Sequence, residues 1–187
     1  MVKRSLDILL SLIAAAIFII PCLIIAILIK ATSPGPIFYV SKRVGQNGKL
    51  FTMPKFRTMR TDTPELATDK LGDPTTYLTP IGGFLRKTSL DELPQIISVL
   101  LGHMSLVGPR PALFNQTDLI TQRQKRGIDN LRPGITGWAQ VNGRDDIASD
   151  IKIQLDAEYM ARQSLWFDIK IMLITIYAVV SRKDISH

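Results

Sequence analysis

The sequence predicts an α+β fold that is mainly α, with an N-terminal membrane helix followed by a compact domain. Residues 8–29 contain no charged side chain and, as a helix, are long enough to cross a hydrocarbon core of about 30 Å. Residues 37–40 and 49–53 carry β-branched and aromatic side chains and flank a Gly-Gln-Asn-Gly turn, which predicts a short β-hairpin. Later segments repeat apolar residues at helical spacing. We therefore divide the chain into a membrane segment, 1–31, and a domain, 32–187.

Composition narrows the chemistry that the chain can carry. Apolar residues make up 46% of the chain and the net charge is +7, which predicts a membrane segment and an anionic partner. No nucleic-acid motif accompanies the charge, so we expect lipid headgroups or a phosphorylated substrate and no nucleic acid. The single cysteine, Cys22, excludes an intrachain disulfide and a cysteine-rich zinc site. Because His103 and His187 are the only histidines, a metal would need oxygen ligands, which suit Mg²⁺.

Two features argue against a simple membrane crossing by residues 8–29. Pro21 lies near the centre, where it removes a backbone hydrogen bond and kinks a helix. Basic residues lie on both sides of the segment, so the positive-inside rule gives no orientation; they are Lys3, Arg4, Lys30, Lys42, Arg43 and Lys49. A re-entrant helix, which bends at Pro21 and returns to the same face, accounts for both features. A straight span and a cleaved signal peptide are the alternatives.

The second strand of the hairpin leads into a basic segment, 55–60. Three cations, Lys55, Arg57 and Arg60, alternate with apolar residues there, as in a solvated strand edge or a phosphate-facing loop. Residues 61–79 are polar, contain prolines and glycine and show little periodicity, which predicts a mobile surface loop.

Two adjacent carboxylates, Asp91 and Glu92, follow Arg86 closely. Carboxylates beside fixed cations stay ionised, and an ionised aspartate can attack an electrophile or hold a metal. The Ser89-x-x-Glu92 spacing is also that of a capping box, so the start of a helix explains the same residues. The apolar spacing over 93–101 predicts that helix, and the glycine after it is a typical helix end.

Two further segments present arginines on stiff or glycine-rich backbone. Pro109 and Pro111 fix the backbone on either side of Arg110, so its guanidinium is presented with little entropy left to lose and suits a phosphate. A proline-rich turn with a solvated arginine is the alternative. Residues 132–144 contain three glycines and end in Arg144; such glycines allow close approach of a ligand to the backbone, or serve turns alone.

The C-terminal part is predicted to be helical. Residues 114–127 suit a polar surface helix, and the chain returns to helix from Ile151 onward. Residues 165–180 are dense in apolar side chains but contain Asp168 and Lys170 and are short for a membrane span. They suit an amphipathic helix that lies at the membrane interface.

Four segments, in this order, closely resemble the bacterial sugar transferases, the monotopic polyprenol-phosphate phosphoglycosyl transferases. They are Lys55-Phe56-Arg57-Thr58-Met59, Ser89-Leu90-Asp91-Glu92-Leu93-Pro94-Gln95, Gly108-Pro109-Arg110-Pro111 and Arg132-Pro133-Gly134-Ile135-Thr136-Gly137. Each segment alone is weak, but four in order are a strong indication. The similarity runs from about Ser5 to the C-terminus, and the short chain resembles the minimal members that begin bacterial N-glycosylation with a bacillosamine-type sugar.

The resemblance implies a reaction. A UDP-sugar gives its sugar-1-phosphate to a polyprenyl phosphate such as undecaprenyl phosphate, which yields polyprenyl-diphospho-sugar and UMP as the first membrane step of glycoconjugate biosynthesis. It makes Asp91 the nucleophile of a covalent phospho-aspartyl intermediate and the ligand of Mg²⁺, and Glu92 the group that handles the lipid-phosphate proton. The substrate-binding positions that it implies are Lys55, Arg86, Pro109, Arg110, Pro111 and Arg144.

The resemblance also implies a place in the cell and a substrate class. We expect a monotopic protein of the bacterial inner membrane whose catalytic domain, 32–187, lies on the cytoplasmic face, and an N-acetylated amino sugar as the transferred group. A homodimer is allowed by the residues but not supported by them. The chain departs from the family at Ile20, where a serine often precedes the proline, and at His103, where aspartate is common. A lipid-diphosphate hydrolase and a non-catalytic membrane-anchored binding module are the alternative functions.

Overall fold

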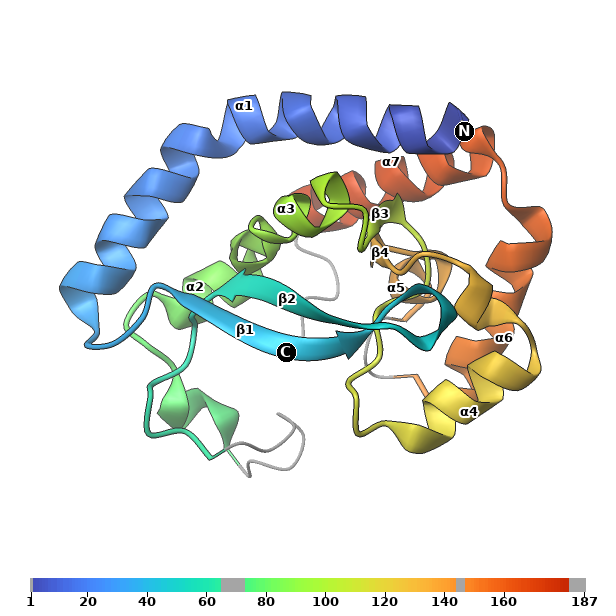
Figure 1. Cartoon of the computed structure of the whole chain (residues 1–187). Helices are drawn as coiled ribbons and strands as arrows, with labels where there is room; N and C mark the ends of the chain where they lie inside the picture. The colour runs from blue at the N-terminus through green and yellow to red at the C-terminus, as the bar shows by residue number, and fades with distance from the viewer. Residues whose placement is uncertain (1, 65–72, 144–146, 182–187) are drawn as a thin grey trace.

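The computed structural model describes residues 2–64, 73–143 and 147–181. The predicted substrate-binding residue Arg144 and part of the predicted loop at 61–79 therefore lie outside the described residues. The helices are α1 (Val2–Thr32), α2 (Gly82–Lys87), α3 (Gln95–Leu100), α4 (Thr117–Lys125), α5 (Trp138–Val141), α6 (Ser149–Arg162) and α7 (Leu165–Ser181). The strands are β1 (Phe38–Val44), β2 (Leu50–Phe56), β3 (Ser105–Val107) and β4 (Gly134–Thr136). The predicted α+β class, mainly α, is confirmed (Figure 1).

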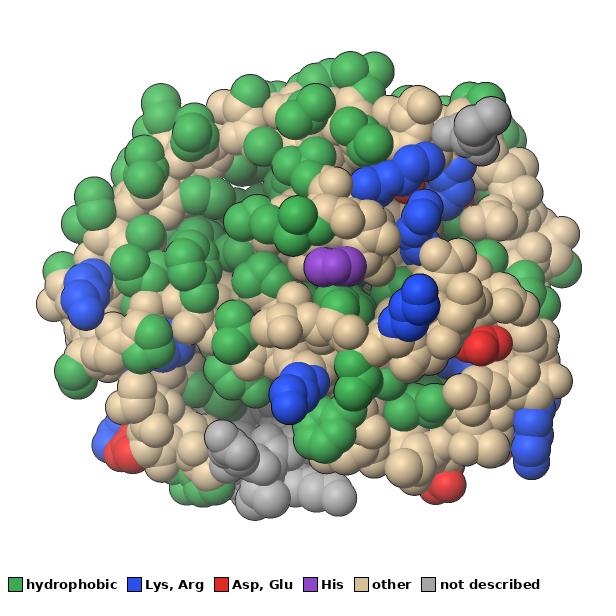
Figure 2. Space-filling model, viewed as in Figure 1, with side chains coloured by type: hydrophobic (Ala, Val, Ile, Leu, Met, Phe, Trp, Pro, Cys, Tyr) green, Lys and Arg blue, Asp and Glu red, His purple; other side chains and the backbone are tan. Residues whose placement is uncertain are grey.

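Helix α1 arches over the rest of the chain and bends part-way along its length (Figure 1). It is one continuous helix of 31 residues with Pro21 inside it, and the missing N–H of a proline accounts for such a bend. Among the described helices it is the one that is long and apolar enough to cross a membrane. Hydrophobic side chains cover its outer surface (Figure 2); Ile17 is 63% exposed and Ile20 66%. Such an unpartnered apolar surface suits a lipid environment.

The N-terminal end of α1 is attached to the domain by polar contacts. Lys3 forms an ion pair with Asp168 of α7, and its Nζ also donates to the carbonyl of Val107 in β3. The carboxylate of Asp7 accepts hydrogen bonds from the Ser105 hydroxyl, at 2.8 Å, and from the amide of Leu106, at 3.2 Å. Lys and Arg side chains gather near this end of α1 (Figure 2).

The C-terminal end of α1 is attached to the same domain by apolar packing. Ile25 and Ile29 are buried in one cluster with Phe56 of β2 and Leu85 of α2. The buried guanidinium of Arg57 donates to the carbonyls just past the end of the helix, those of Ser33 and Pro34. Carbonyls at a helix end need such donors, because they have no partner within the helix. Both ends of α1 therefore contact one body.

The predicted hairpin is confirmed, with longer strands than expected. β1 pairs with β2 antiparallel along its whole length, and the turn passes through Asn47 in the left-handed region, at φ 56°. A second, parallel pair joins β3 to β4, although the sequence indicated only loops there. Three-residue strands in glycine- and proline-rich segments carry no alternating pattern. The β3–β4 pair brings two of the four motif segments into direct backbone contact, since Gly108 N–H donates to Thr136.

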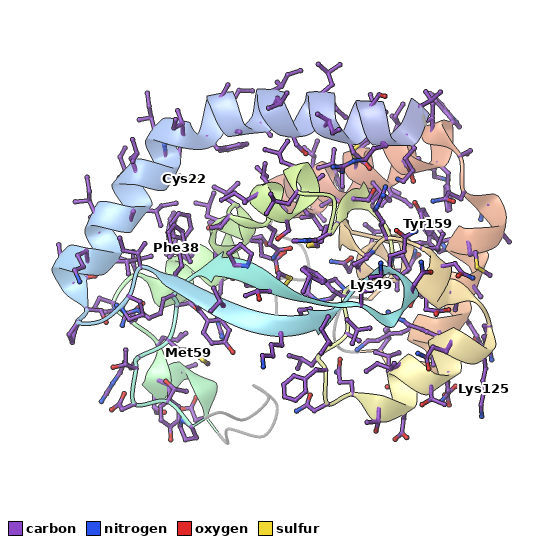
Figure 3. All side chains as sticks on the ribbon, in the orientation of Figure 1. Cys22, Phe38, Lys49, Met59, Lys125 and Tyr159 are labelled. Atoms are coloured by element: carbon purple, nitrogen blue, oxygen red, sulfur yellow. The ribbon has the colours of Figure 1, made fainter. Side chains whose placement is uncertain are left out.

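The C-terminal helices confirm the predicted elements at 114–127 and 165–180. Tyr159 of α6, labelled in Figure 3, is 1% exposed, and its hydroxyl donates to Asp168 and to the carbonyl of Val107. Helix α7 buries Phe167 and Ile171 against α6, while other apolar side chains of the helix stay exposed: Trp166, Leu173, Ile176 and Tyr177. The interfacial position of α7 stays a prediction, which its exposed apolar side chains suit.

Candidate active site

The two adjacent carboxylates lie on a tight turn and not at a helix cap. Ser89 has φ 55°, in the left-handed region, and its side chain makes no capping hydrogen bond. The 3-10 turn Leu90–Glu92 follows, before α3 begins at Gln95. The capping-box interpretation is therefore wrong, because the left-handed residue redirects the chain before the helix starts. The turn buries Asp91, which is 7% exposed.

Cations from three other elements surround this turn. Lys55 of β2 lies with its Nζ 2.6 Å from Glu92 Oε1 and 4.0 Å from Asp91 Oδ2. The guanidinium of Arg110, in the segment 108–111, approaches Glu92 Oε1 at 3.4 Å. Arg86 of α2 donates its Nε–H to the Thr58 hydroxyl, and its charge acts on Asp91. The structure thus brings together Lys55, Arg86 and Arg110, as the motifs predicted.

The cations of segment 55–60 have three different environments. Lys55 faces the carboxylates, Arg57 is buried against the end of α1, and Arg60 is exposed beside Asp62. Only Arg60 is solvated, and the phosphate-facing interpretation of Lys55 stays a prediction. Strand β2 ends at Phe56, so Arg57 and Arg60 lie beyond it and do not follow the alternation that places Lys55.

Burial controls the ionisation of Asp91. It raises the pKa of the carboxyl to about 6, and the repulsion from Glu92 adds to this, while Lys55 and Arg86 act in the opposite direction and only partly offset it. Asp91 is therefore less readily ionised than its neighbouring cations alone imply, because a desolvated carboxylate loses more than the cations return. At pH 7 the group is still mainly ionised, as a nucleophile must be.

The oxygen atoms of Asp91 and Glu92 are the right chemistry for Mg²⁺, but they make an incomplete site. Within the described ranges no group of three or more His, Cys, Asp and Glu side chains comes together. Mg²⁺ in phosphoryl-transfer sites is commonly bound by one or two carboxylates, with substrate phosphates and water as the other ligands. The donor set fits a metal that arrives with a diphosphate.

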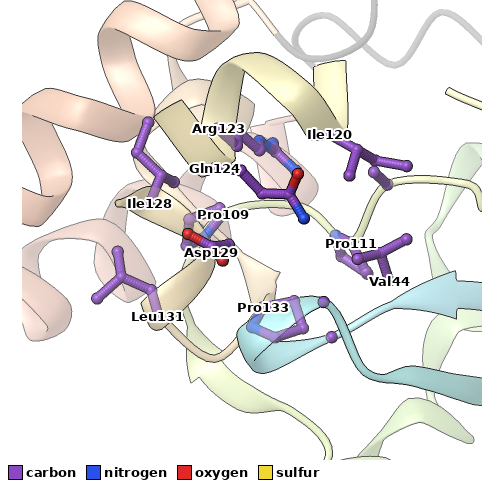
Figure 4. A pocket seen from close by; sticks show the side chains of 13 residues that line it. Val44, Pro109, Pro111, Ile120, Arg123, Gln124, Ile128, Asp129, Leu131 and Pro133 are labelled. Carbon is purple, nitrogen blue, oxygen red and sulfur yellow. The ribbon is translucent and has the colours of Figure 1, made fainter. Parts of the chain in front are cut away.

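The Pro-Arg-Pro loop (Pro109, Arg110 and Pro111) is held by two arginines that the sequence did not reveal. Arg123 donates to the carbonyl of Arg110 at 2.8 Å, and Arg43 donates to the carbonyl of Pro111 at 3.1 Å. The donors lie 13 and 68 residues from their acceptors along the chain, beyond the reach of a local pattern. Behind the loop is a recess lined by both prolines and by residues of α4 (Figure 4). His103, where the chain departs from the family, packs its ring against Phe51.

Residues 1–182 match the sequence model of the family described as bacterial sugar transferase. The chain belongs to this family. Over 190 residues it is 40% identical to the uncharacterized sugar transferase EpsL of Bacillus subtilis, which covers 99% of this chain and 90% of that protein. Membership makes the chain an enzyme of the transferase class, and the resemblance seen in the four motifs is confirmed.

Other relatives carry names that specify a reaction. The chain is 36% identical to the UDP-glucose:undecaprenyl-phosphate glucose-1-phosphate transferase of Escherichia coli, over 95% of this chain and 40% of that protein. It is 38% identical to the UDP-N-acetylgalactosamine-undecaprenyl-phosphate N-acetylgalactosaminephosphotransferase of Aeromonas hydrophila, over 96% and 44%. The chain thus spans less than half the length of these two bacterial sugar transferases.

Proposed function

We propose that this bacterial sugar transferase moves a sugar-1-phosphate from a UDP-sugar to polyprenyl phosphate, with UMP as the leaving group. The observation that carries the proposal is a buried aspartate, Asp91, beside Glu92 and within the field of cations from three other elements. A site with more cations than carboxylates is suited to a diphosphate, whose own charges would otherwise repel the attacking carboxylate. The names of the relatives support the same donor and acceptor classes.

The proposed reaction has two displacement steps at one phosphorus. An Asp91 carboxylate oxygen bonds to the phosphorus next to the sugar, and the bond from that phosphorus to the oxygen of UMP breaks. An oxygen of polyprenyl phosphate then bonds to the same phosphorus, and the bond to Asp91 breaks, which restores the carboxylate. Glu92 accepts the proton of the incoming lipid phosphate. A bound Mg²⁺, held by Asp91, would neutralise charge on the diphosphate.

The cations have separate proposed roles. Lys55 pairs with Glu92 at 2.6 Å and lies 4.0 Å from Asp91, so it can neutralise both acids and the arriving diphosphate. Arg110 is 31% exposed at its side chain and offers a fork of donors to a phosphate. Arg86 and Arg144 complete the proposed substrate-binding set, with Pro109 and Pro111 fixing the loop backbone.

We propose a re-entrant, monotopic topology for α1, with the domain on the cytoplasmic face of the inner membrane. Its support is the contact of both helix ends with one body, through Asp7 at the N-terminal end and Ile29 at the other. A straight span would separate these ends by the thickness of the bilayer. To test this, cysteines would replace the exposed Ser5 and Lys30, one at a time, in a Cys22→Ala background. An impermeant thiol reagent should label both from the same side, and opposite-side labelling would overturn the topology.

The transferred sugar is proposed to be an N-acetylated amino sugar, from the resemblance to the minimal members of the family. The relatives named above act on different sugars, glucose in one and N-acetylgalactosamine in the other. A panel of UDP-sugars, scored by UMP release with and without undecaprenyl phosphate, tests both the sugar and the reaction. Release that needs the lipid phosphate supports transfer. Free sugar phosphate formed without lipid would instead identify a hydrolase.

A further inference from the structure

Four consecutive backbone carbonyls fix the loop that presents Arg110. The Pro109 carbonyl accepts from the Gly134 amide at 2.9 Å, and the Arg110 carbonyl accepts from the Arg123 guanidinium at 2.8 Å. The Pro111 carbonyl accepts from the Arg43 guanidinium at 3.1 Å, and the Ala112 carbonyl accepts from the Val44 amide at 3.0 Å. A proline has no N–H, so its carbonyl is its only backbone group for a hydrogen bond. The loop is therefore oriented through its oxygens by neighbours from three places in the chain: the end of β1, α4 and β4.

Arg123, the donor to the Arg110 carbonyl, differs from the other three donors because it is part of a buried ion pair. Arg123 is 9% exposed and Asp156, on α6, is 1% exposed. Nε and Nη2 of Arg123 donate to Asp156 Oδ2 at 3.0 and 2.6 Å, while Nη1 of the same guanidinium donates to the carbonyl of Arg110. A guanidinium is planar and holds its donors in a fixed fork. With one edge on Asp156, the direction of the Nη1–H bond is also fixed.

Packing behind the loop does not replace these hydrogen bonds. A recess lies between the loop and α4, lined by Pro109 and Pro111 on one side and by Ile120 and Arg123 on the other (Figure 4). Side chains that border open space give less resistance to movement than those in a close-packed interior. Pro109, Pro111 and Ala112 are nevertheless buried, so the hydrogen bonds act together with packing to hold the loop.

We infer that Arg123, oriented by Asp156, is a positioning residue that fixes the backbone of Arg110 and so aims the Arg110 guanidinium at the phosphate beside Glu92. The inference rests on the proposed function, in which Arg110 binds a phosphate of the substrate. Arg110 lies 3.4 Å from Glu92, so a small displacement of its backbone changes which atoms its fork can reach. Preorganised donors are effective because they need no rearrangement when charge develops.

The first test is a double-mutant cycle on UMP release by the full chain. Arg123→Lys keeps a positive charge for Asp156, but a single ammonium cannot span the carboxylate and the carbonyl as the fork does. We expect kcat/KM to fall by about tenfold to a hundredfold, the scale of a small misplacement. In an Arg110→Ala background the same change should have no further effect. An equal loss in both backgrounds, or no loss in the first, would overturn the inference.

A second variant separates positioning from stability. Arg123→Met with Asp156→Leu replaces the pair by apolar side chains of similar size, a change that often preserves or raises stability. Its kcat/KM should fall as far as that of Arg123→Lys, and the loss should again disappear in the Arg110→Ala background. Its unfolding temperature should stay at or above the wild-type value. Full activity in it would count against the inference. Arg162→Lys, at an exposed ion pair with Glu158, is the matched control and should keep wild-type turnover.

Hydrogen exchange gives a readout that needs no turnover. The amides of Val44 and Gly134 donate to the loop carbonyls on either side of Arg110. In Arg123→Lys both amides should exchange faster, while amides of α7 keep their wild-type rates. Unchanged exchange at both amides would overturn the positioning role. Absence of lipid-dependent UMP release from the wild-type chain would instead overturn the proposed function, so the two failures are distinguishable.

Discussion

Asp91 and Asp156 are both buried aspartates that face cations, but their oxygens are used differently. Asp156 accepts two hydrogen bonds from one guanidinium, at 3.0 and 2.6 Å. Asp91 has its nearest ion-pair partner, Lys55, at 4.0 Å. Burial raises the pKa of both carboxyl groups. Asp156 is closely paired with a structural partner, whereas Asp91 is only loosely paired, which suits its proposed role.

Because of this difference, burial of the carboxylate costs more stability at Asp91 than at Asp156. A buried carboxylate that is closely paired recovers part of its desolvation penalty through its hydrogen bonds, while a loosely paired one recovers less. Functional sites commonly hold groups in such unfavourable states, because the surrounding structure keeps them there. We therefore expect Asp91 to matter for turnover and Asp156 to matter for folding and for the loop that it helps to hold.

The largest expected effect is that of Asp91→Asn on turnover. An amide cannot act as the nucleophile, so UMP release should fall by at least about a thousandfold and no phosphosugar adduct should form. Because the wild-type carboxylate is held in an unfavourable environment, the variant should unfold at an equal or higher temperature. Kinetics, intact-mass measurement and thermal unfolding check these expectations. Normal turnover, or an adduct on another residue, would remove Asp91 from its role.

The second effect is that of Asp156→Ala on stability. The change leaves the Arg123 guanidinium buried without its carboxylate, and breaking a buried pair in this way costs about 3–5 kcal/mol. Thermal or denaturant unfolding in detergent measures the loss. Glu158→Gln is the control, since Glu158 pairs with Arg162 at the surface and the amide can still accept the Trp138 N–H. If Asp156→Ala were no less stable than the control, the contrast between the two aspartates would fail.

Local patterns predicted one side of this contrast and not the other. The adjacent acids and the family resemblance indicated Asp91 together with Lys55, Arg86 and Arg110, and the structure gathers these residues. Arg123 lies in a segment that reads as a polar surface helix, and its partner is on a different helix. Nothing in the spacing of such a helix shows which of its cations turns inward, because burial there depends on contacts distant in the sequence.

The same reason explains the other differences in the fold. Bend and hairpin were predictable from Pro21 and from the turn at 45–48, where the residues themselves restrict the backbone. The left-handed conformation of Ser89 and the pairing of β3 with β4 depend on surrounding structure and have no local signal. The capping-box reading failed because a spacing of three residues between serine and glutamate permits a helix start without requiring it.

A third buried aspartate, Asp168, extends the comparison to the attachment of α1. Its oxygens accept hydrogen bonds from Lys3 and from the Tyr159 hydroxyl. Asp168→Ala leaves both donors without this partner and should lower stability by about 1–3 kcal/mol, less than the loss at Asp156. Lys170→Ala, two residues away on α7 and exposed, is the control and should unfold like the wild type. A loss as large as that of Asp156→Ala would show that α1 attachment dominates the stability of the domain.

The smallest expected effect is a pH dependence of stability that belongs to Asp91, measured in EDTA so that no divalent ion is bound. The pKa of its carboxyl is 3.8 in the unfolded chain and about 6 in the folded one. Between these values the folded state keeps the proton and the unfolded state releases it, so this group lowers stability as pH rises through the window. Asp91→Asn lacks the group, and its stability advantage over the wild type should therefore grow from about pH 4 to pH 6 and then level off. Thermal unfolding of both proteins at pH steps from 4 to 8 measures the difference. An advantage that shrinks as pH rises would mean that Lys55 and Arg86 outweigh burial, and Asp91 would then be a stabilised carboxylate like any well-paired surface acid.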